Sequence, residues 1–263
     1  MRRALGAAAV AVAGLLSAAP ASAILIRPDR DDAEYLELAT KYTSYVSLGV
    51  PDGGGVLINS RWVLTAAHMA KVVEQRKGHR IRIGAGEHAV EKVVVHPDWK
   101  KGGHSDIGLI LLRSAVTDVD PTPVYTATDE AGKTVIIVGS GYTGKIGEKP
   151  TKEKWDRKPR AAINTVDKLG PRTLFLQIKD KDNASDLQGA AAPGDSGGPA
   201  FIETPEGFRV IGIGYATDDT NANGIVGDIG DWEIYARAST YADWILRTML
   251  DVAREEAAKL LGG

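Results

Sequence analysis

The sequence predicts an all-β fold that ends in one helix. Short apolar runs recur along the chain and are separated by Gly, Pro, Asn and Asp, which is typical of strands joined by turns. No period of about 20–50 residues repeats, so a propeller or a solenoid is not indicated. The predicted strand cores are Tyr45–Leu48, Val56–Ile58, Ile81–Ile83, Val93–Val95, Ile107–Leu112, Val135–Val138, Leu174–Ile178 and Val210–Ile213.

Residues 1–23 have the pattern of a secretory signal peptide. Arg2 and Arg3 form a basic start, an alanine-rich apolar core follows, and the small residues at 21–23 resemble a cleavage site. The apolar stretch is short and weakly apolar for a membrane span, so we expect a secreted protein without a stable membrane anchor. Cleavage after Ala23 leaves 240 of the 263 residues, enough for one large core or two small ones.

Charge and cysteine content narrow the function classes. The formal net charge is −2, and it becomes more negative when both arginines leave with the signal peptide, so nucleic-acid binding is not indicated. The chain has no cysteine. Because an exported fold without disulfides must be stabilised by buried apolar strands, we expect a large core, and we expect a monomer.

The last part of the chain predicts a helix over residues 241–260. Thr240 and Asp243 form a predicted capping box at its start. Apolar positions then recur at the three- and four-residue spacing of one helix face. These positions are Tyr241, Trp244, Ile245, Thr248, Met249 and Val252.

Three polar residues have the settings of a nucleophile, a base and an acid. Ser196 lies in Gly194–Pro199, where flanking glycines can expose its hydroxyl on a tight turn beside free backbone amides. His68 follows one apolar run, and Asp106 opens another. All five histidines precede Ser196, which excludes the α/β-hydrolase order, and Asp106 follows His68, which disfavours the subtilisin order. The order His, Asp, Ser remains.

Around these residues the chain resembles the trypsin/chymotrypsin-like serine peptidases. The resemblance implies two packed antiparallel β-barrels, residues 24–120 and 121–240, with the cleft between them as the site. The stretch 118–129 would be the crossover. Members of that family often have cysteines where this chain has Met69 and Ala192. The resemblance rests on Gly54–His68, Asp106–Leu109, Gly194–Pro199 and Ile234–Arg237, in the family's order.

The resemblance assigns a role to each of these residues. It implies Ser196 as the nucleophile, His68 as the general base and acid, and Asp106 as the group that orients the imidazole. The backbone amides of Gly194 and Ser196 would form the oxyanion hole. The implied activity is endopeptidase cleavage of proteins or peptides through an acyl-enzyme, with no organic cofactor. The alternative is a catalytically inactive homologue that binds ligands, although such proteins usually lack one of the three residues.

A specificity pocket is also implied by the resemblance. Its floor would be Ala190, one wall Tyr215 and Ala216, and the opposite wall Glu233. Because no aspartate lies at the floor, we expect aromatic, leucine or lysine side chains before the cut bond rather than a strict arginine requirement. Ala216 leaves an elastase-like preference for small side chains open, and Glu233 could instead be a surface residue.

Two further sites are expected. The family is activated when a new N-terminal amine, usually of isoleucine or valine, pairs with the aspartate before the catalytic serine. Here these residues would be Ile24, exposed by cleavage after Ala23, and Asp195. Separately, the segment 219–226 matches the first half of a calcium loop, although Gly230 stands where a glutamate is expected. The candidate calcium ligands are Asp219, Asn221, Asn223 and Asp231.

Overall fold

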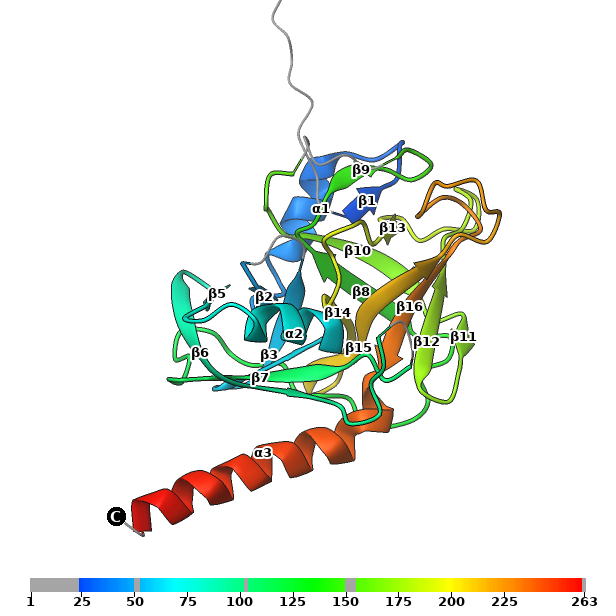
Figure 1. Cartoon of the computed structure of the whole chain (residues 1–263). Coiled ribbons are helices and arrows are strands. Elements are labelled where there is room, and N and C mark those ends of the chain that lie inside the picture. Colours follow the sequence, from blue (N-terminus) through cyan, green and yellow to red (C-terminus); the bar gives the residue numbers. More distant parts are fainter. Residues whose placement is uncertain (1–23, 50–52, 102–103, 150–154, 262–263) are drawn as a thin grey trace, which may run out of the picture.

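The computed structural model describes residues 24–49, 53–101, 104–149 and 155–261, and the predicted signal peptide, residues 1–23, lies outside them. Within these residues the chain forms sixteen strands and three helices (Figure 1). The all-β class and the C-terminal helix are confirmed.

The first half of the chain forms a closed six-stranded barrel. Its strand order is β2-β3-β4-β7-β6-β5. Every pairing is antiparallel, and Leu64 of the fourth strand lies opposite Val56 on one side and Leu109 on the other. The bounds are β2 Tyr45–Ser47, β3 Gly54–Asn59, β4 Trp62–Thr65, β5 Arg80–Ile83, β6 Gly86–Val95 and β7 Gly108–Leu112.

The second half forms a seven-stranded antiparallel sheet in the order β10-β8-β14-β15-β16-β12-β11. Its longest strand, β15, shifts register between Gly214 and Ala216. This irregularity lies where the sheet passes the site described below. The bounds are β8 Thr134–Gly139, β10 Arg160–Thr165, β11 Lys168–Leu169, β12 Thr173–Gln177, β14 Pro199–Thr204, β15 Gly207–Asp218 and β16 Trp232–Arg237.

A small third sheet lies at one end of the molecule (Figure 1). Strand β1 (Ile24–Ile26) lies between β13 (Gly189–Ala190), with which it is antiparallel, and β9 (Thr143–Lys145), with which it is parallel. All three residues of β1 are buried. The first described residues therefore lie inside the protein, beside the segment that leads to Ser196.

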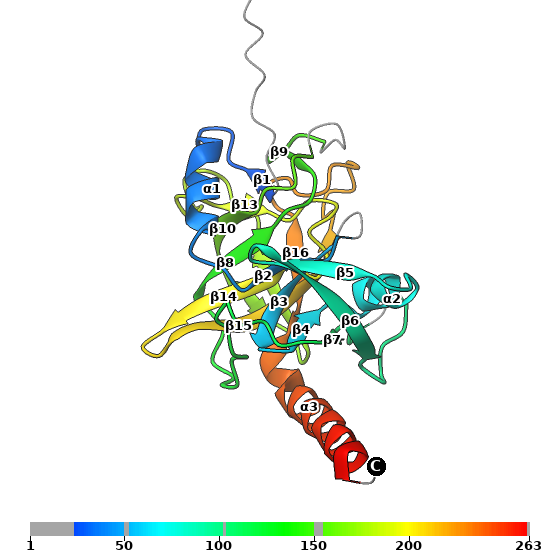
Figure 2. The ribbon, with the colours of Figure 1, turned by 90° about the vertical axis from the view of Figure 1, so that its left-hand side faces the viewer.

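The three helices are α1 (Asp32–Ala39), α2 (Ala67–Glu74) and α3 (Ala238–Leu261). Helix α3 projects from the end of the molecule opposite α1 (Figures 1 and 2). It follows β16 directly, so Thr240 lies within its first turn and donates to the Pro171 carbonyl at 3.4 Å. The predicted capping box at Thr240 is therefore wrong. Among the described residues, no helix is both long and apolar enough to cross a membrane.

One hydrophobic core joins the two halves. It contains Leu64 and Leu109 of the barrel, Phe201 and Ile213 of the seven-stranded sheet, and Tyr241 of α3, all of them buried. Because the halves share this core, their facing surfaces are fixed relative to each other. The site lies along that junction.

Candidate active site

His68 and Asp106 meet at the end of two paired strands. His68 lies in the first turn of α2, directly after β4, and Asp106 precedes β7, the partner of β4. The Asp106 Oδ2 atom is 2.8 Å from His68 Nδ1, and Oδ1 accepts the His68 backbone N–H at 2.9 Å. The Asp106 side chain is 8% exposed and that of His68 is 33% exposed. With Nδ1 bound to the carboxylate, Nε2 is the ring nitrogen left to take up a proton.

Ser196 lies on a tight turn that contacts the barrel. The Gly54 backbone N–H donates to the Ser196 carbonyl at 2.8 Å, and the Gly197 N–H donates to the Gly214 carbonyl at 2.7 Å. Gly197 has a φ of +83°, and a Cβ there would collide with the Thr65 hydroxyl and the Gly54 carbonyl. Only glycine therefore allows the turn to lie against the barrel at Thr65, which is three residues before His68 in the chain.

The backbone amides of Gly194 and Ser196 are available to a ligand. Among the described residues, neither amide donates to a protein acceptor. The Pro193 carbonyl accepts the Tyr142 N–H at 2.8 Å. Because C=O and N–H point in opposite directions across a trans peptide, this contact turns the Gly194 N–H away from Tyr142. Gly194 has a φ of +102°, which a side chain would make costly. Two unpaired donors beside Ser196 can stabilise an oxyanion.

A cavity of about 200 Å³ opens beside Ser196. Tyr215 and Ala216 lie on its wall, as does Ala191. Ala190 and Glu233 are fully buried and do not line the cavity. Ala190 belongs to β13, and its side chain packs in a buried apolar cluster with Leu25 and Ile178 instead of lining the cavity.

Asp195 is a buried carboxyl group held by backbone amides. The Gly141 N–H donates to Oδ1 at 2.7 Å, and the Ala192 N–H donates to Oδ2 at 2.8 Å. The Ile24 backbone N–H also lies near enough to lower the pKa of this carboxyl. Burial outweighs these contacts and raises the pKa of Asp195 from 3.8 to about 6. The fold therefore brings Ile24 and Asp195 together, with a neutral peptide amide as the contact between them.

Comparison with known proteins places the chain in a family. The profile of the trypsin family matches residues 39–245, most of the chain. This chain belongs to the trypsin family.

Two relatives and one solved structure show how similar this trypsin-family chain is to known proteins. It is 30% identical to phenoloxidase-activating factor 3 of Holotrichia diomphalia, over 82% of this chain and 70% of that protein. It is 24% identical to CLIP domain-containing serine protease B4 of Anopheles gambiae, over 78% of this chain and 65% of that protein. The structure of neuropsin, a serine protease of mouse brain, superposes with a TM-score of 0.62 at 22% identity, covering 79% of this chain and 95% of neuropsin. The chymotrypsin-like fold is confirmed by that likeness.

Glu233 lies behind the cavity wall of this trypsin-family site. Its Oε1 accepts the backbone N–H of Ala191, a wall residue, while its buried Oε2 has no hydrogen-bond partner among the described residues. Burial raises the pKa of Glu233 to about 8. The Glu233 side chain is therefore mainly neutral at pH 7. The wall residue Ala191 lies between it and the cavity.

The segment 219–231 forms a loop closed by its own hydrogen bonds. Asp219 accepts the N–H groups of Asn223 and Gly224, at 3.2 and 2.9 Å. Asp231 accepts the Thr220 N–H at 2.9 Å. The side-chain amides of Asn221 and Asn223 donate to Asp228 rather than presenting oxygens to a common centre. No group of three or more His, Cys, Asp or Glu side chains within the described residues has the geometry of a metal site. The calcium site stays a prediction.

Several residues that build the site were not predicted from the sequence. Gly141 and Tyr142 orient Asp195 and the Gly194 peptide, and Gly54 holds the Ser196 carbonyl. The available signal was the glycine-rich stretch 139–144, since a Cβ at Gly139 would collide with the Asp195 carboxyl. These contacts are made by backbone groups, which the residue types at those positions do not reveal.

Proposed function

We propose that this chain is a secreted serine endopeptidase that uses His68, Asp106 and Ser196. The observation that carries the proposal is the turn at Ser196, beside which the amides of Gly194 and Ser196 donate to no acceptor among the described residues. A binding module has no need of unpaired amides next to a serine hydroxyl and a cavity. Stabilising a developing oxyanion requires them, and one such donor is worth roughly 3–4 kcal/mol in the transition state.

In the proposed mechanism, Ser196 Oγ attacks the carbonyl carbon of the substrate while His68 Nε2 takes its proton. The carbonyl oxygen becomes negative and accepts hydrogen bonds from the two amides. Asp106, held 2.8 Å from Nδ1, stabilises the imidazolium ion. His68 then gives its proton to the leaving amine, and the C–N bond breaks. Water, activated by His68, hydrolyses the acyl-enzyme and restores Ser196.

Labelling by a fluorophosphonate probe tests this function directly. We expect the processed protein to be labelled at one site, Ser196, identified by peptide mass spectrometry. The Ser196→Ala variant should not be labelled and should lose turnover by roughly three orders of magnitude or more. If the folded parent protein stays unlabelled, the alternative of an inactive, ligand-binding homologue replaces the proposal.

We propose a preference for leucine or aromatic side chains before the cut bond at neutral pH, with lysine accepted more readily at higher pH. The support is Glu233, whose pKa of about 8 leaves it mainly neutral at pH 7 and charged above pH 8. Small side chains are the competing preference, because Ala216 lies on the wall of a cavity of only about 200 Å³. Cleavage of a peptide library distinguishes these preferences.

We also propose that the amine of Ile24, created by cleavage after Ala23, activates the enzyme by pairing with Asp195. Two features support this. The Ile24 backbone N–H already lies near enough to Asp195 to lower its pKa. Ile24 also has a φ of +63°, a conformation that costs a β-branched residue about 1–3 kcal/mol. Because φ is defined by the peptide bond before a residue, cutting that bond removes this constraint.

The remaining proposals concern partners. We expect protein or peptide substrates, no nucleic acid, a monomeric state, no organic cofactor and no stable membrane anchor. The calcium prediction at Asp219, Asn221, Asn223 and Asp231 is tested by calorimetric titration of the processed protein with Ca²⁺.

A further inference from the structure

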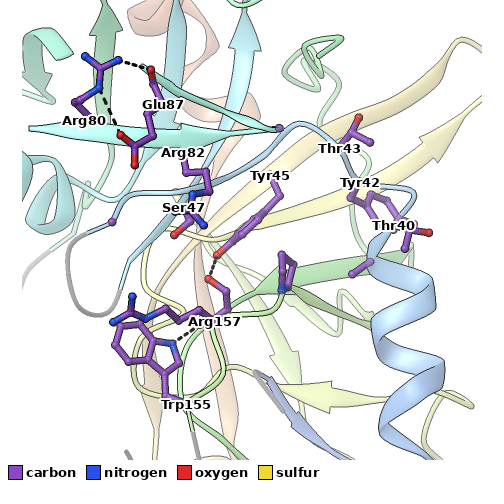
Figure 3. Close-up of a pocket in the computed structure, with 15 residues that line it drawn as sticks. Thr40, Tyr42, Thr43, Tyr45, Ser47, Arg80, Arg82, Glu87, Trp155 and Arg157 are labelled. Atoms are coloured by element: carbon purple, nitrogen blue, oxygen red, sulfur yellow. Dashed lines mark hydrogen bonds and ion pairs between the residues drawn. The ribbon is translucent and has the colours of Figure 1, made fainter. Parts of the chain in front are cut away.

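A cavity separate from the site at Ser196 lies beside the first barrel. Its volume is about 620 Å³. Figure 3 shows Arg82 between two pairs, Arg80 with Glu87 and Arg157 with Trp155. We call it the basic groove, and the lining residues that matter here are Tyr45, Arg80, Arg82, Ser140, Trp155 and Arg157.

The basic groove carries uncompensated positive charge. Arg82 and Arg157 are exposed, and neither forms an ion pair with another described residue. Arg80 lies 3.6 Å from Glu87, the only acidic side chain among the described lining residues. The Arg157 guanidinium lies over the Trp155 ring, 4.6 Å from its centroid. This stacking restricts where the Arg157 charge can move and leaves its N–H groups free to bind an anion.

The rest of the lining is fixed and partly apolar. The Tyr45 and Ser140 hydroxyls are 2.7 Å apart, and the Trp155 indole N–H donates to the Ser140 carbonyl at 2.7 Å. Aromatic faces alternating with hydroxyls and guanidinium groups suit a peptide, which offers carboxylates and apolar side chains together. A long polyanion such as heparin needs a broad basic surface, and Glu87 interrupts this one.

The basic groove and the specificity cavity share no lining residue and are built from different elements around the Ser196 turn. Ser140 of the groove precedes Gly141, which binds Asp195. Tyr45 lies on β2, the partner of β3, whose Gly54 binds the Ser196 carbonyl. Tyr215 and Ala216, which line the specificity cavity, lie on β15 instead. A substrate whose side chain before the cut bond enters that cavity would continue, after the cut bond, toward the basic groove.

We propose that the basic groove binds acidic residues of the protein substrate in the segment that follows the cut bond. The proposal rests on the proposed peptidase function and assigns that peptidase a class of substrate. The charge complementarity is between carboxylates and the guanidinium groups of Arg82 and Arg157.

Binding is tested first without catalysis, on the Ser196→Ala protein. The probe is a fluorescein-labelled hexapeptide of alternating glutamate and tyrosine, measured by fluorescence anisotropy, with a glutamine peptide for comparison. We expect Arg82→Glu/Arg157→Glu to weaken binding of the glutamate peptide about tenfold or more. The matched control is Arg247→Glu/Arg254→Glu, which reverses two exposed charges on α3 and should have no effect. Equal affinity of the groove variant and its parent would overturn the proposal, as would stronger competition by heparin than by the unlabelled peptide.

Catalysis is tested with peptides that differ only in carrying glutamate or glutamine at the second to fourth positions after the cut bond. We expect the parent to favour the glutamate peptide about tenfold in kcat/KM and the groove variant to lose that preference. A small chromogenic amide without those positions should be hydrolysed equally by both proteins. Equal cleavage of the two peptides by the parent would overturn the groove proposal, whereas failure to hydrolyse any substrate would reject the peptidase function and leave the binding result intact.

Discussion

The two buried carboxylates of the candidate site, Asp106 and Asp195, differ in what they contact. Asp106 binds the imidazole and the backbone N–H of His68, so its partner is a group that can become cationic. Asp195 accepts hydrogen bonds from peptide amides, and its pKa is raised to about 6 because burial outweighs both these amides and the charge of Arg160. The fold alone supplies Asp106 with its partner, His68. Asp195 has no such partner among the described residues, and cleavage before Ile24 would create a cation beside it.

The largest expected effect concerns His68, the partner of Asp106, and Ser196. His68→Ala and Ser196→Ala should each lower kcat by roughly three orders of magnitude or more, and the double variant should be no worse than either single variant. The reason is that the two residues act on the same proton transfer. Steady-state kinetics with a chromogenic amide measure all three proteins. Additive losses would mean that His68 does not act through Ser196.

The second prediction compares the two states of the Asp195 region. In the processed protein, Asp195→Asn should destabilise by about 3–5 kcal/mol, because it leaves a buried ammonium group unpaired. In a chain that retains one alanine before Ile24, the same substitution should be neutral or stabilising, because it removes a buried carboxyl that has no cation. Urea unfolding at pH 7 measures both. If Asp195→Asn changes the unfolding free energy in the same direction in both forms, Asp195 does not act in activation.

The third prediction follows from the raised pKa of Asp195. In the unprocessed chain, the neutral carboxyl is favoured by folding, so its stabilising contribution is present below about pH 4 and is lost as the pH rises through about 6. The shift from 3.8 to about 6 corresponds to about 3 kcal/mol. In the processed chain the Ile24 amine should lower the pKa of Asp195. The stabilising contribution of Asp195 should then be lost as the pH falls, not as it rises. Unfolding free energies from pH 4 to 7, each compared with its Asp195→Asn counterpart, should diverge between the two forms.

The smallest effect concerns Glu233. Because its pKa is about 8, raising the pH from 6.5 to 9 should increase the kcat/KM for a lysine substrate relative to a leucine substrate, by up to about tenfold. Taking the ratio cancels any effect of pH on steps that both substrates share. Glu233→Gln should make the ratio independent of pH. A pH-dependent ratio in that variant would assign the effect to another group.

The sequence predicted this molecule well where side chains determine structure. The apolar run Val56–Ile58 lies in β3, and the run Ile107–Leu112 covers β7, which begins one residue later at Gly108, because buried strands need apolar residues. Helix α2 was missed because eight residues directly after a strand give too few periodic positions to detect. The Tyr142 contact with the Pro193 carbonyl is made by backbone atoms, and Ala190 packs in a buried cluster with Leu25 instead of lining the cavity. Neither follows from residue type.

The two halves also differ in how exposed they leave their hydrogen-bonding edges. Because the barrel is closed, it offers no free strand edge, whereas the seven-stranded sheet has two. One edge of that sheet, β11, has only two residues. Beside the other, β10, lies α1, attached by a fully buried Arg160 that binds both carboxylate oxygens of Asp32 at 2.7 Å. Protection of the β10 edge against self-assembly therefore depends on this eight-residue helix with its ion pair, and on the Leu187 carbonyl, which accepts the Ile163 N–H at 2.8 Å.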